Sequence, residues 1–210
     1  MLDAAKTNAD TWERIHRERD WGRYANEDLV RFVSRNLLTG PRSEKHILEL
    51  GCGTGANLWM LARENFNAYG VDISVTAIKK AERHLARDGY YAQLTVGDVT
   101  DLGRLFPVEY IFNAVVDIGT LMHLTTEQAV CTIAEAHAML VPGGKYFAAE
   151  CVTDDCWRGP VDDRGYVHFW REDELRAAFA AFADVKIEKT TRTYENQSHV
   201  YSRWIVEATK

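Results

Sequence analysis

The stretch that decides the fold is "ELGCGTGA", residues 49–56. Its glycines follow the apolar run "HILEL" (46–50) and precede the helical pattern "ANLWMLARE". A glycine-rich turn between a strand and a helix lets the backbone approach a ligand closely, and the helix N-terminus offers free N–H donors. The stretch therefore predicts a strand–turn–helix unit whose turn binds a ligand.

Strand and helix signals alternate around this unit. Strand-like runs at 67–72, 91–96, 110–116 and 145–150 are separated by helical patterns, two of which begin at a Ser74 cap and a Thr125–Gln128 capping box. This alternation predicts an α/β protein with a doubly wound parallel sheet. The last two strand-like runs, 185–194 and 199–209, are joined by "ENQS" and predict an antiparallel hairpin.

The 210 residues predict a single domain. We divide it into an N-terminal helical cap (1–44), a ligand-binding core (45–150), a loop (151–170) and a helix with the terminal hairpin (171–210). We expect a monomer or a homodimer.

Composition limits the partners. The net charge of -6 argues against nucleic acid and anionic membranes, which need a basic surface. With no apolar stretch near the roughly 18 residues of a membrane span and no signal peptide, we expect a cytoplasmic protein. The four cysteines predict reduced thiols, and Cys151 with Cys156 is a poor zinc pattern, so we expect no metal.

The glycine turn fits two cofactor fingerprints. Gly51, Gly53 and Ala56 satisfy the G-x-G-x-x-G/A pattern of dinucleotide binding, whereas Glu49 and the glycines satisfy the E/D-x-G-x-G-x-G pattern of S-adenosylmethionine (SAM) sites. In both cases an acid about twenty residues later, here Asp72, can bind a ribose diol. The turn alone therefore does not discriminate between the two cofactors.

Three further features favour SAM, with S-adenosylhomocysteine (SAH) as product. Glu49 can face an ammonium group, which SAM has and NAD lacks. Asp98, after the third strand, offers an acceptor for the adenine amine, and the terminal hairpin is foreign to the ordinary nicotinamide domain. A nicotinamide or flavin enzyme and a non-catalytic SAM-binding module remain as alternatives.

Five motifs in this order and spacing resemble the class I SAM-dependent methyltransferases, close to the small-molecule enzymes of quinone biosynthesis and natural-product pathways. The resemblance implies a Rossmann-like, seven-stranded sheet of order 3-2-1-4-5-7-6 with strand 7 antiparallel, and 45–150 as the SAM-binding core. The motifs are "LELGCGTG" (48–55), "GVDIS" (70–74), "GDVTDL" (97–102), "VVDIGTLMHL" (115–124) and "LVPGGKYF" (140–147).

The resemblance also implies the cofactor residues. The glycine turn lines SAM, the acids bind its methionine end, ribose and adenine amine, and the N-terminal helix covers it, with Arg23 on the carboxylate and Tyr24 at the sulfonium. Packing of this helix onto the sheet is the alternative. The predicted cofactor residues are Glu49, Gly51, Cys52, Gly53, Asp72, Ile73, Asp98, Val99, Arg23 and Tyr24.

Acceptor residues are expected at the carboxyl edge of the sheet. The aromatic, acidic segment 151–170 predicts a lid, with His168 as proton acceptor and Asp117, after the fourth strand, as a second catalytic residue. His123 is assigned to core packing. The predicted acceptor-binding residues are Trp157, Tyr166, Arg192 and Tyr194.

The predicted reaction is O- or N-methylation of a small molecule, anionic or aromatic in character. Arg158, Arg164 and Arg192 are the hint of an anionic acceptor. A peptide or protein acceptor is the alternative.

Overall fold

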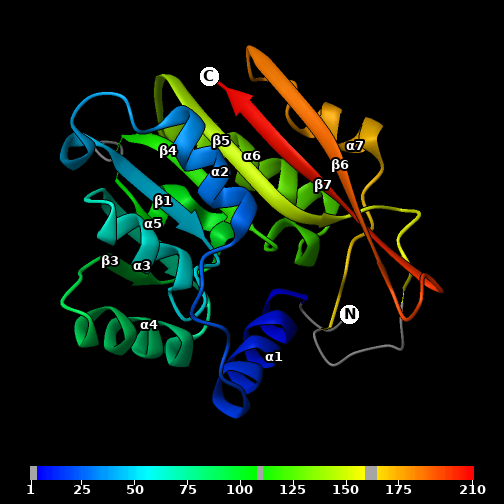
Figure 1. Ribbon diagram of the computed structural model, residues 1–210, viewed down its shortest axis with the longest axis horizontal. Coiled ribbons are helices and arrows are strands. Elements are labelled where there is room, and N and C mark those ends of the chain that lie inside the picture. The colour runs from blue at the N-terminus through cyan, green and yellow to red at the C-terminus, as the bar shows by residue number, and fades with distance from the viewer. Residues whose placement is uncertain (1–3, 108–110, 159–164) are drawn as a thin grey trace.

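The computed structural model describes residues 4–107, 111–158 and 165–210. One sheet of seven strands runs through it in the order β3-β2-β1-β4-β5-β7-β6 (Figure 1). Strands β1 to β5 pair in parallel, and β7 is antiparallel to both of its neighbours. The predicted fold class, strand order and reversed strand are therefore confirmed. The strands are β1 (His46–Leu50), β2 (Asn67–Asp72), β3 (Gln93–Val96), β4 (Phe112–Ile118), β5 (Leu140–Val152), β6 (Asp184–Tyr194) and β7 (His199–Thr209).

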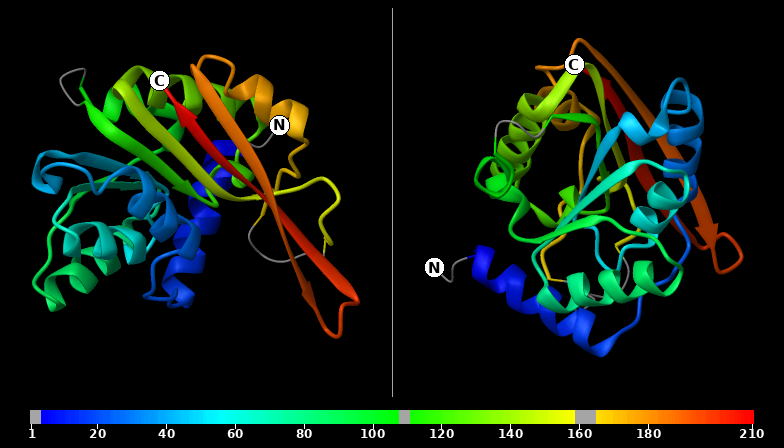
Figure 2. Two further views of the ribbon diagram at one scale, coloured as in Figure 1. Left: turned by 45° about the horizontal axis from the view of Figure 1, so that its top comes forward. Right: turned by 90° about the vertical axis from the view of Figure 1, so that its left-hand side faces the viewer.

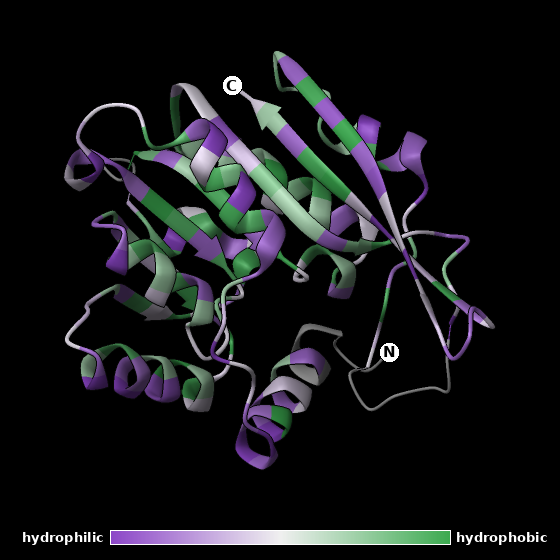
Figure 3. Ribbon diagram, viewed as in Figure 1, coloured by the Kyte–Doolittle hydropathy of each residue, from purple (hydrophilic) through white to green (hydrophobic). Residues whose placement is uncertain are grey.

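Helices cover both faces of the sheet. One apolar core lies between the sheet and α2, α3 and α4, and a second lies between the sheet and α5, α6 and α7. The central strands are correspondingly apolar along most of their length (Figure 3), as expected for parallel strands buried on both faces. The helices are α1 (Ala4–Glu18), α2 (Glu27–Asn36), α3 (Ala56–Arg63), α4 (Val75–Arg87), α5 (Leu102–Leu105), α6 (Thr126–Met139) and α7 (Glu172–Ala178), with short 3-10 turns η1 (Arg42–Glu44), η2 (Val99–Asp101) and η3 (Leu121–His123).

Helices α4 and α6 begin at the capping residues predicted from the sequence. The Ser74 hydroxyl accepts from the N–H of Ala77 at the start of α4. The side chains of Thr125 and Gln128 form a reciprocal capping box at α6. Asn26 caps α2 through its carboxamide oxygen. These caps satisfy N–H groups that have no partner inside the helix.

Strand β5 differs from the prediction. It spans Leu140–Val152 rather than 145–150, so "PGG" (142–144) lies inside the strand. The ladder to β4 is irregular between Phe112 and Ala114, which accommodates these residues. The predicted start of the fourth strand, Tyr110, lies outside the described residues.

A β-bulge interrupts β5 at its carboxyl end. Ala148 pairs with Val206 and Cys151 with Trp204, so two residues of β5 face Ile205 alone. The second of them, Glu150, has a φ of 64°, which is uncommon for a residue other than glycine. Bulges bend a strand and redirect its side chains.

Two elements extend beyond the carboxyl edge of the sheet. The β6–β7 hairpin projects past the other strands, and α1 lies across the ends of the central strands (Figure 2). Residues 159–164 of the predicted lid, and Arg164 with them, lie outside the described residues, so the lid stays a prediction. In the described ranges, no helix has the length and apolarity to cross a membrane.

Candidate functional site

A cavity of about 310 Å³ lies at the carboxyl edge of the sheet, enclosed by α1. Four loops after β1, β2, β3 and β4 form its floor, and β5 and β7 supply one wall. Its lining residues are Asn8, Trp12, His16, Trp21, Gly51, Gly53, Asp72, Ile73, Gly97, Asp98, Val99, Ile118, Gly119, Thr120, Met122, His123, Leu124, Gln128, Glu150 and Tyr201.

The glycine turn after β1 needs glycine for two reasons. Gly51 and Gly53 have φ values of 62° and 51°. A Cβ on Gly51 would also overlap Oγ1 of Thr120, which donates to the carbonyl of Leu50 at 3.0 Å. The turn thus presents bare backbone to the cavity.

Asp72, at the end of β2, holds the turn in place. One carboxylate oxygen accepts from the N–H of Gly53 and the other from the N–H of Ser74, both at 2.8 Å. Burial raises the pKa of Asp72, and the two N–H donors act against that shift. Since a carboxylate has about four acceptor sites, two remain for a ligand in the cavity.

The loop after β3 completes the predicted cofactor set. Oδ1 of Asp98 accepts from the N–H and hydroxyl of Thr100, at 2.9 and 2.8 Å, and begins η2. Ile73, Asp98 and Val99 line the cavity. Asp72 and Asp98 therefore lie on neighbouring loops that face the same space.

Glu49 and Cys52 lie behind the glycine turn rather than in the cavity wall. Oε1 of Glu49 accepts from Nδ2 of Asn57 at 2.6 Å, while Oε2 is buried without a partner. Burial raises the pKa of Glu49 to about 8. The Cys52 side chain packs against Gly70, and burial raises its thiol pKa, so this thiol is not poised as a nucleophile.

The cover of the cavity comes from α1 and the residues after it. Trp12, His16 and Trp21 line the cavity, whereas Arg23 and Tyr24 do not. Tyr24 is 94% exposed. The predicted roles of Arg23 and Tyr24 in SAM binding stay predictions. Both residues lie between α1 and α2, where no helical period predicts the direction of a side chain.

Polar contacts hold α1 over the cavity. Glu13 accepts from the hydroxyls of Ser74 and Thr76, at 2.7 and 2.6 Å, and from the N–H of Thr76. Partial burial acts to raise the pKa of Glu13, but these hydrogen bonds prevail and lower it to about 2. The amide of Asn8 donates to the carbonyl of His123, whose ring meets that of Trp12 at 4.8 Å.

The predicted catalytic residue Asp117 is fully buried below the cavity. Its carboxylate accepts from the N–H groups of Thr120 and Leu121 at 3.0–3.3 Å. Burial raises its pKa to about 7, against the effect of these donors. In this position Asp117 shapes the loop after β4 rather than lining the cavity.

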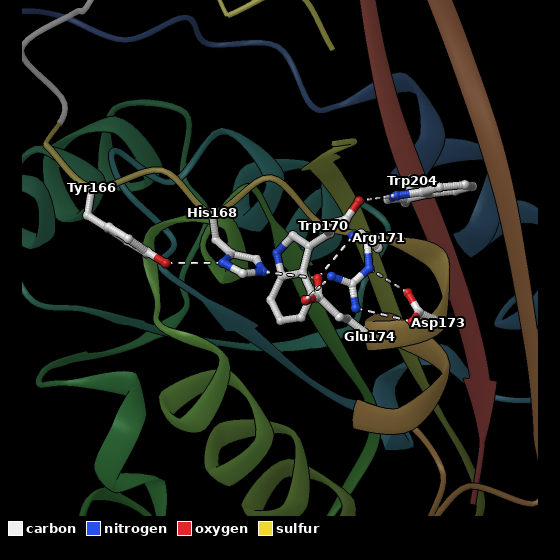
Figure 4. A network of polar contacts seen from close by, with 7 residues as sticks. All are labelled: Tyr166, His168, Trp170, Arg171, Asp173, Glu174 and Trp204. Carbon is white, nitrogen blue, oxygen red and sulfur yellow. Dashed lines mark hydrogen bonds and ion pairs between the residues drawn. The ribbon is translucent and has the colours of Figure 1, made fainter. Parts of the chain in front are cut away.

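His168, the predicted proton acceptor, also lies outside the cavity wall. Its ring contacts the hydroxyl of Tyr166 at 3.1 Å and the carboxylate of Glu174 at 3.4 Å (Figure 4). Its ring also lies 4.3 Å from that of Trp170. These contacts join the segment before α7 to that helix.

The predicted acceptor-binding residues have partners or exposed surface outside the cavity wall. Trp157 stacks on His199 at 4.0 Å, and Arg192 pairs with Glu27. Tyr166 and Tyr194 are about half exposed. None of these four lines the cavity, and their roles stay predictions. In the described part of the chain, no group of three or more His, Cys, Asp or Glu side chains comes together as a metal site.

The sequence analysis missed several cavity residues. His123 lines the cavity although it was assigned to the core, and its Nδ1 lies 2.9 Å from the carbonyl of Tyr166. Thr120 belongs to the motif at 115–124, but its contact with the glycine turn, where a Cβ on Gly51 would overlap its Oγ1, is seen only in the structure. Topology alone places Glu150, at the end of the predicted fifth strand, on the acceptor edge. Tyr201 carries no local pattern, because the hairpin brings it to the site.

The residues fit SAM. The glycine turn at positive φ, the acid after β2 with acceptor sites left on its carboxylate and the second acid after β3 suit its amino-acid, ribose and adenine parts, and the unpartnered Oε2 of Glu49 lies behind them. The strand order with a reversed seventh strand is that of the class I SAM-dependent methyltransferases. The chain has the fold of this class, whose cofactor is SAM.

Comparison with known proteins agrees with this class. Residues 47–144 match the family described as "Methyltransferase domain". The magnesium protoporphyrin IX methyltransferase of Synechocystis PCC 6803, crystallised with bound SAM, superposes with a TM-score of 0.72 at 18% identity, covering 100% of this chain and 98% of that one.

Two curated relatives differ in their substrates. The ubiquinone biosynthesis O-methyltransferase of Brucella anthropi is 27% identical over 179 residues, 78% of this chain and 69% of the relative. The tRNA N(3)-methylcytidine methyltransferase trm140 of Schizosaccharomyces pombe is 28% identical over 149 residues, 61% of this chain and 48% of the relative. The chain thus spans about half the length of this second relative.

The exclusion of nucleic acid was wrong, since it is contradicted by similarity to enzymes whose names specify tRNA. Net charge is a sum over the whole surface and does not describe any one region of it. In the structure, a second hollow of about 330 Å³ is rich in basic side chains. Among its lining residues are Arg23, Lys80, Arg83, His84 and Arg87.

Proposed function

We propose that the protein transfers the methyl group of SAM to an acceptor bound at the β4–β5–β7 side of the cavity. The observation that carries this proposal is the cavity itself, in which the glycine turn, Asp72 and Asp98 follow three neighbouring strands and face one space. Methyl transfer from a sulfonium is an in-line displacement, so orientation and exclusion of water can supply much of the rate.

The chain's own residues have separate tasks in this reaction. Asp72 and Asp98 bind and orient the nucleoside part, and the backbone of Gly51 and Gly53 approaches the amino-acid part. Trp12 and Trp21 cover the cavity and exclude water from it. SAM supplies an electrophilic methyl group when bound.

As acceptor we propose a small molecule methylated at oxygen or nitrogen. The cover by α1 and the coverage of both chains in the match to a ubiquinone-pathway O-methyltransferase support this choice. A tRNA acceptor is the alternative that the second relative favours.

The test has two parts. Calorimetry should show binding of SAH in the micromolar range or tighter and no binding of NADH; binding of NADH without SAH would overturn the function. Next, methyl-labelled SAM is incubated with catechol, tyramine or total tRNA. Label in a low-mass product supports a small acceptor, whereas nuclease-sensitive label on tRNA overturns that choice and retains methyl transfer.

A further inference from the structure

Glu150 stands apart from the rest of the sheet in its backbone. It is the second residue of the β5 bulge and adopts a φ of 64°, a left-handed conformation that is strained for a residue with a Cβ. Such strain persists where surrounding structure enforces it, and it is common at functional sites. Gly119 lies beside it, where an added Cβ would stand 3.5 Å from that of Glu150.

The carboxylate of Glu150 is held from one side only. Arg203, which is 8% exposed, pairs with Oε1, and Nδ2 of Asn26 donates to the same oxygen at 3.2 Å. Oε2 has no hydrogen-bond partner among the described residues and is not among the buried unpartnered atoms. One oxygen is thus fixed while the other stays available.

Several contacts fix Glu150 in position. The backbone N–H of Asn26 donates to the amide oxygen of Asn57 at 2.9 Å, and Nδ2 of Asn57 donates to Glu49. Asn26 and Asn57 therefore connect Glu150 with Glu49 behind the glycine turn. A side chain fixed in this way loses little conformational entropy when it binds a ligand.

Glu150 lines the cavity together with Gly119, Met122 and Tyr201, on loops and strands remote from Asp98. We propose that Glu150 binds the methyl acceptor, its Oε2 accepting the hydrogen of the hydroxyl or amine that is methylated. This assignment rests on the proposed function. It names the substrate class as acceptors whose nucleophilic atom carries an O–H or N–H.

Sinefungin provides a test that needs no knowledge of the acceptor. In this analogue a carbon bearing a primary amine replaces the methylated sulfonium, so its amine offers N–H donors at the reacting position. Calorimetry should show that Glu150→Gln weakens sinefungin binding about ten- to a hundredfold, as expected for a charged hydrogen bond. SAH, which lacks the amine, should bind within about twofold of wild type.

Glu64→Gln is the matched control, because Glu64 also pairs with an arginine, Arg42, but lies at the end of α3 away from the cavity. It should leave both affinities unchanged. Retained SAH binding shows that a variant is folded, and Glu150→Asn, which tolerates positive φ, provides a second variant. If the Glu150 variants change the affinities for sinefungin and SAH equally, or change neither, the assignment is overturned. If wild type binds neither ligand, the proposed function itself fails.

Discussion

The two sides of the cavity are built in different ways. The side formed by β1, β2 and β3 uses residues that directly follow neighbouring strands. Asp72 and Asp98 each accept from the backbone N–H two residues later, and Asp72 also accepts from that of Gly53 in the adjacent turn. The side formed by β4, β5 and β7 joins Glu150 to Asn26 and Arg203, which are 124 and 53 residues away in sequence. The first side depends on local motifs, and the second depends on the completed fold.

The same difference separates the cofactor from the acceptor. A common cofactor can be served by a turn that recurs with its sequence, whereas the acceptor side is assembled from a bulge, a hairpin and the N-cap residue of α2. We therefore expect substitutions on the first side to change SAM or SAH affinity, and substitutions on the second to spare it. The following predictions test that separation in order of effect.

Gly51→Ala should have the largest effect. The new Cβ would overlap Oγ1 of Thr120 at a φ of 62°, so we expect a loss of about 2–4 kcal/mol in the free energy of unfolding and loss of SAH binding. Chemical denaturation and calorimetry measure both. Gly89→Ala, with φ at 77° but no atom within 4 Å, isolates the strain and should keep SAH affinity. If both variants behave alike, the overlap is irrelevant.

The apo protein should lose stability as pH rises because of Glu49. Its folded pKa of about 8 lies above the unfolded value of 4.5, so its contribution is fully present below pH 4.5 and is lost as pH rises through 8. Glu49→Gln stays neutral and should be more stable than wild type at pH 9 by a few kcal/mol (~3). The two should be similar near pH 4.5.

Thermal unfolding between pH 4.5 and 9 checks this dependence. The exposed Glu44→Gln serves as control and should follow the wild-type curve. An unchanged pH profile in Glu49→Gln would contradict the assignment to that carboxyl.

Asp72→Ala should weaken SAH binding by about 1.5–3 kcal/mol, since it removes the proposed acceptor for the ribose hydroxyls. Titration calorimetry gives the affinity directly. Asp101→Ala, which removes an exposed acid paired with Arg104, should bind normally. A folded Asp72→Ala protein with wild-type affinity would leave Asp72 only its role in holding Gly53 and Ser74.

Glu13→Gln should have the smallest effect, because it weakens the attachment of α1 without touching the cavity floor. Loss of a charged acceptor at the start of α4 resembles loss of a helix cap, about 0.5–2 kcal/mol. We expect SAH affinity to fall by a few fold (~5), with increased quenching of tryptophan fluorescence by acrylamide. Glu18→Gln, whose partner Arg14 lies on the same helix, should change neither measurement.

Sequence was most informative where chemistry is local. The alternation of periods predicted the parallel sheet, and the terminal hairpin predicted its reversed strand. The resemblance of five motifs to a known family implied the sheet order and assigned Asp72 and Asp98 to the cofactor, and both line the cavity. Sequence failed where placement depends on remote contacts. Tyr24 and Trp21 are three residues apart and equally aromatic, yet Trp21 lines the cavity and Tyr24 is exposed, because the path of the chain after α1 decides between them.

His168 and Glu150 show the same limit. His168 belongs to the segment that follows β5, and its predicted role as proton acceptor rested on that position at the carboxyl edge of the sheet. The structure instead joins its ring to Tyr166 and Glu174. Glu150 is an ordinary glutamate in the sequence, and only the unpaired register between Ala148 and Cys151 distinguishes it.

The bulge in β5 also shifts the alternation of side chains between the two faces of the sheet. Side chains alternate between faces with a period of two, so one extra residue exchanges the faces of everything that follows. The extra residue is why Ala148 and Cys151, three positions apart, pack into the same core as their partners Val206 and Trp204. A sequence alignment that ignores the extra residue and applies strict alternation would therefore assign the wrong face to the whole segment after it.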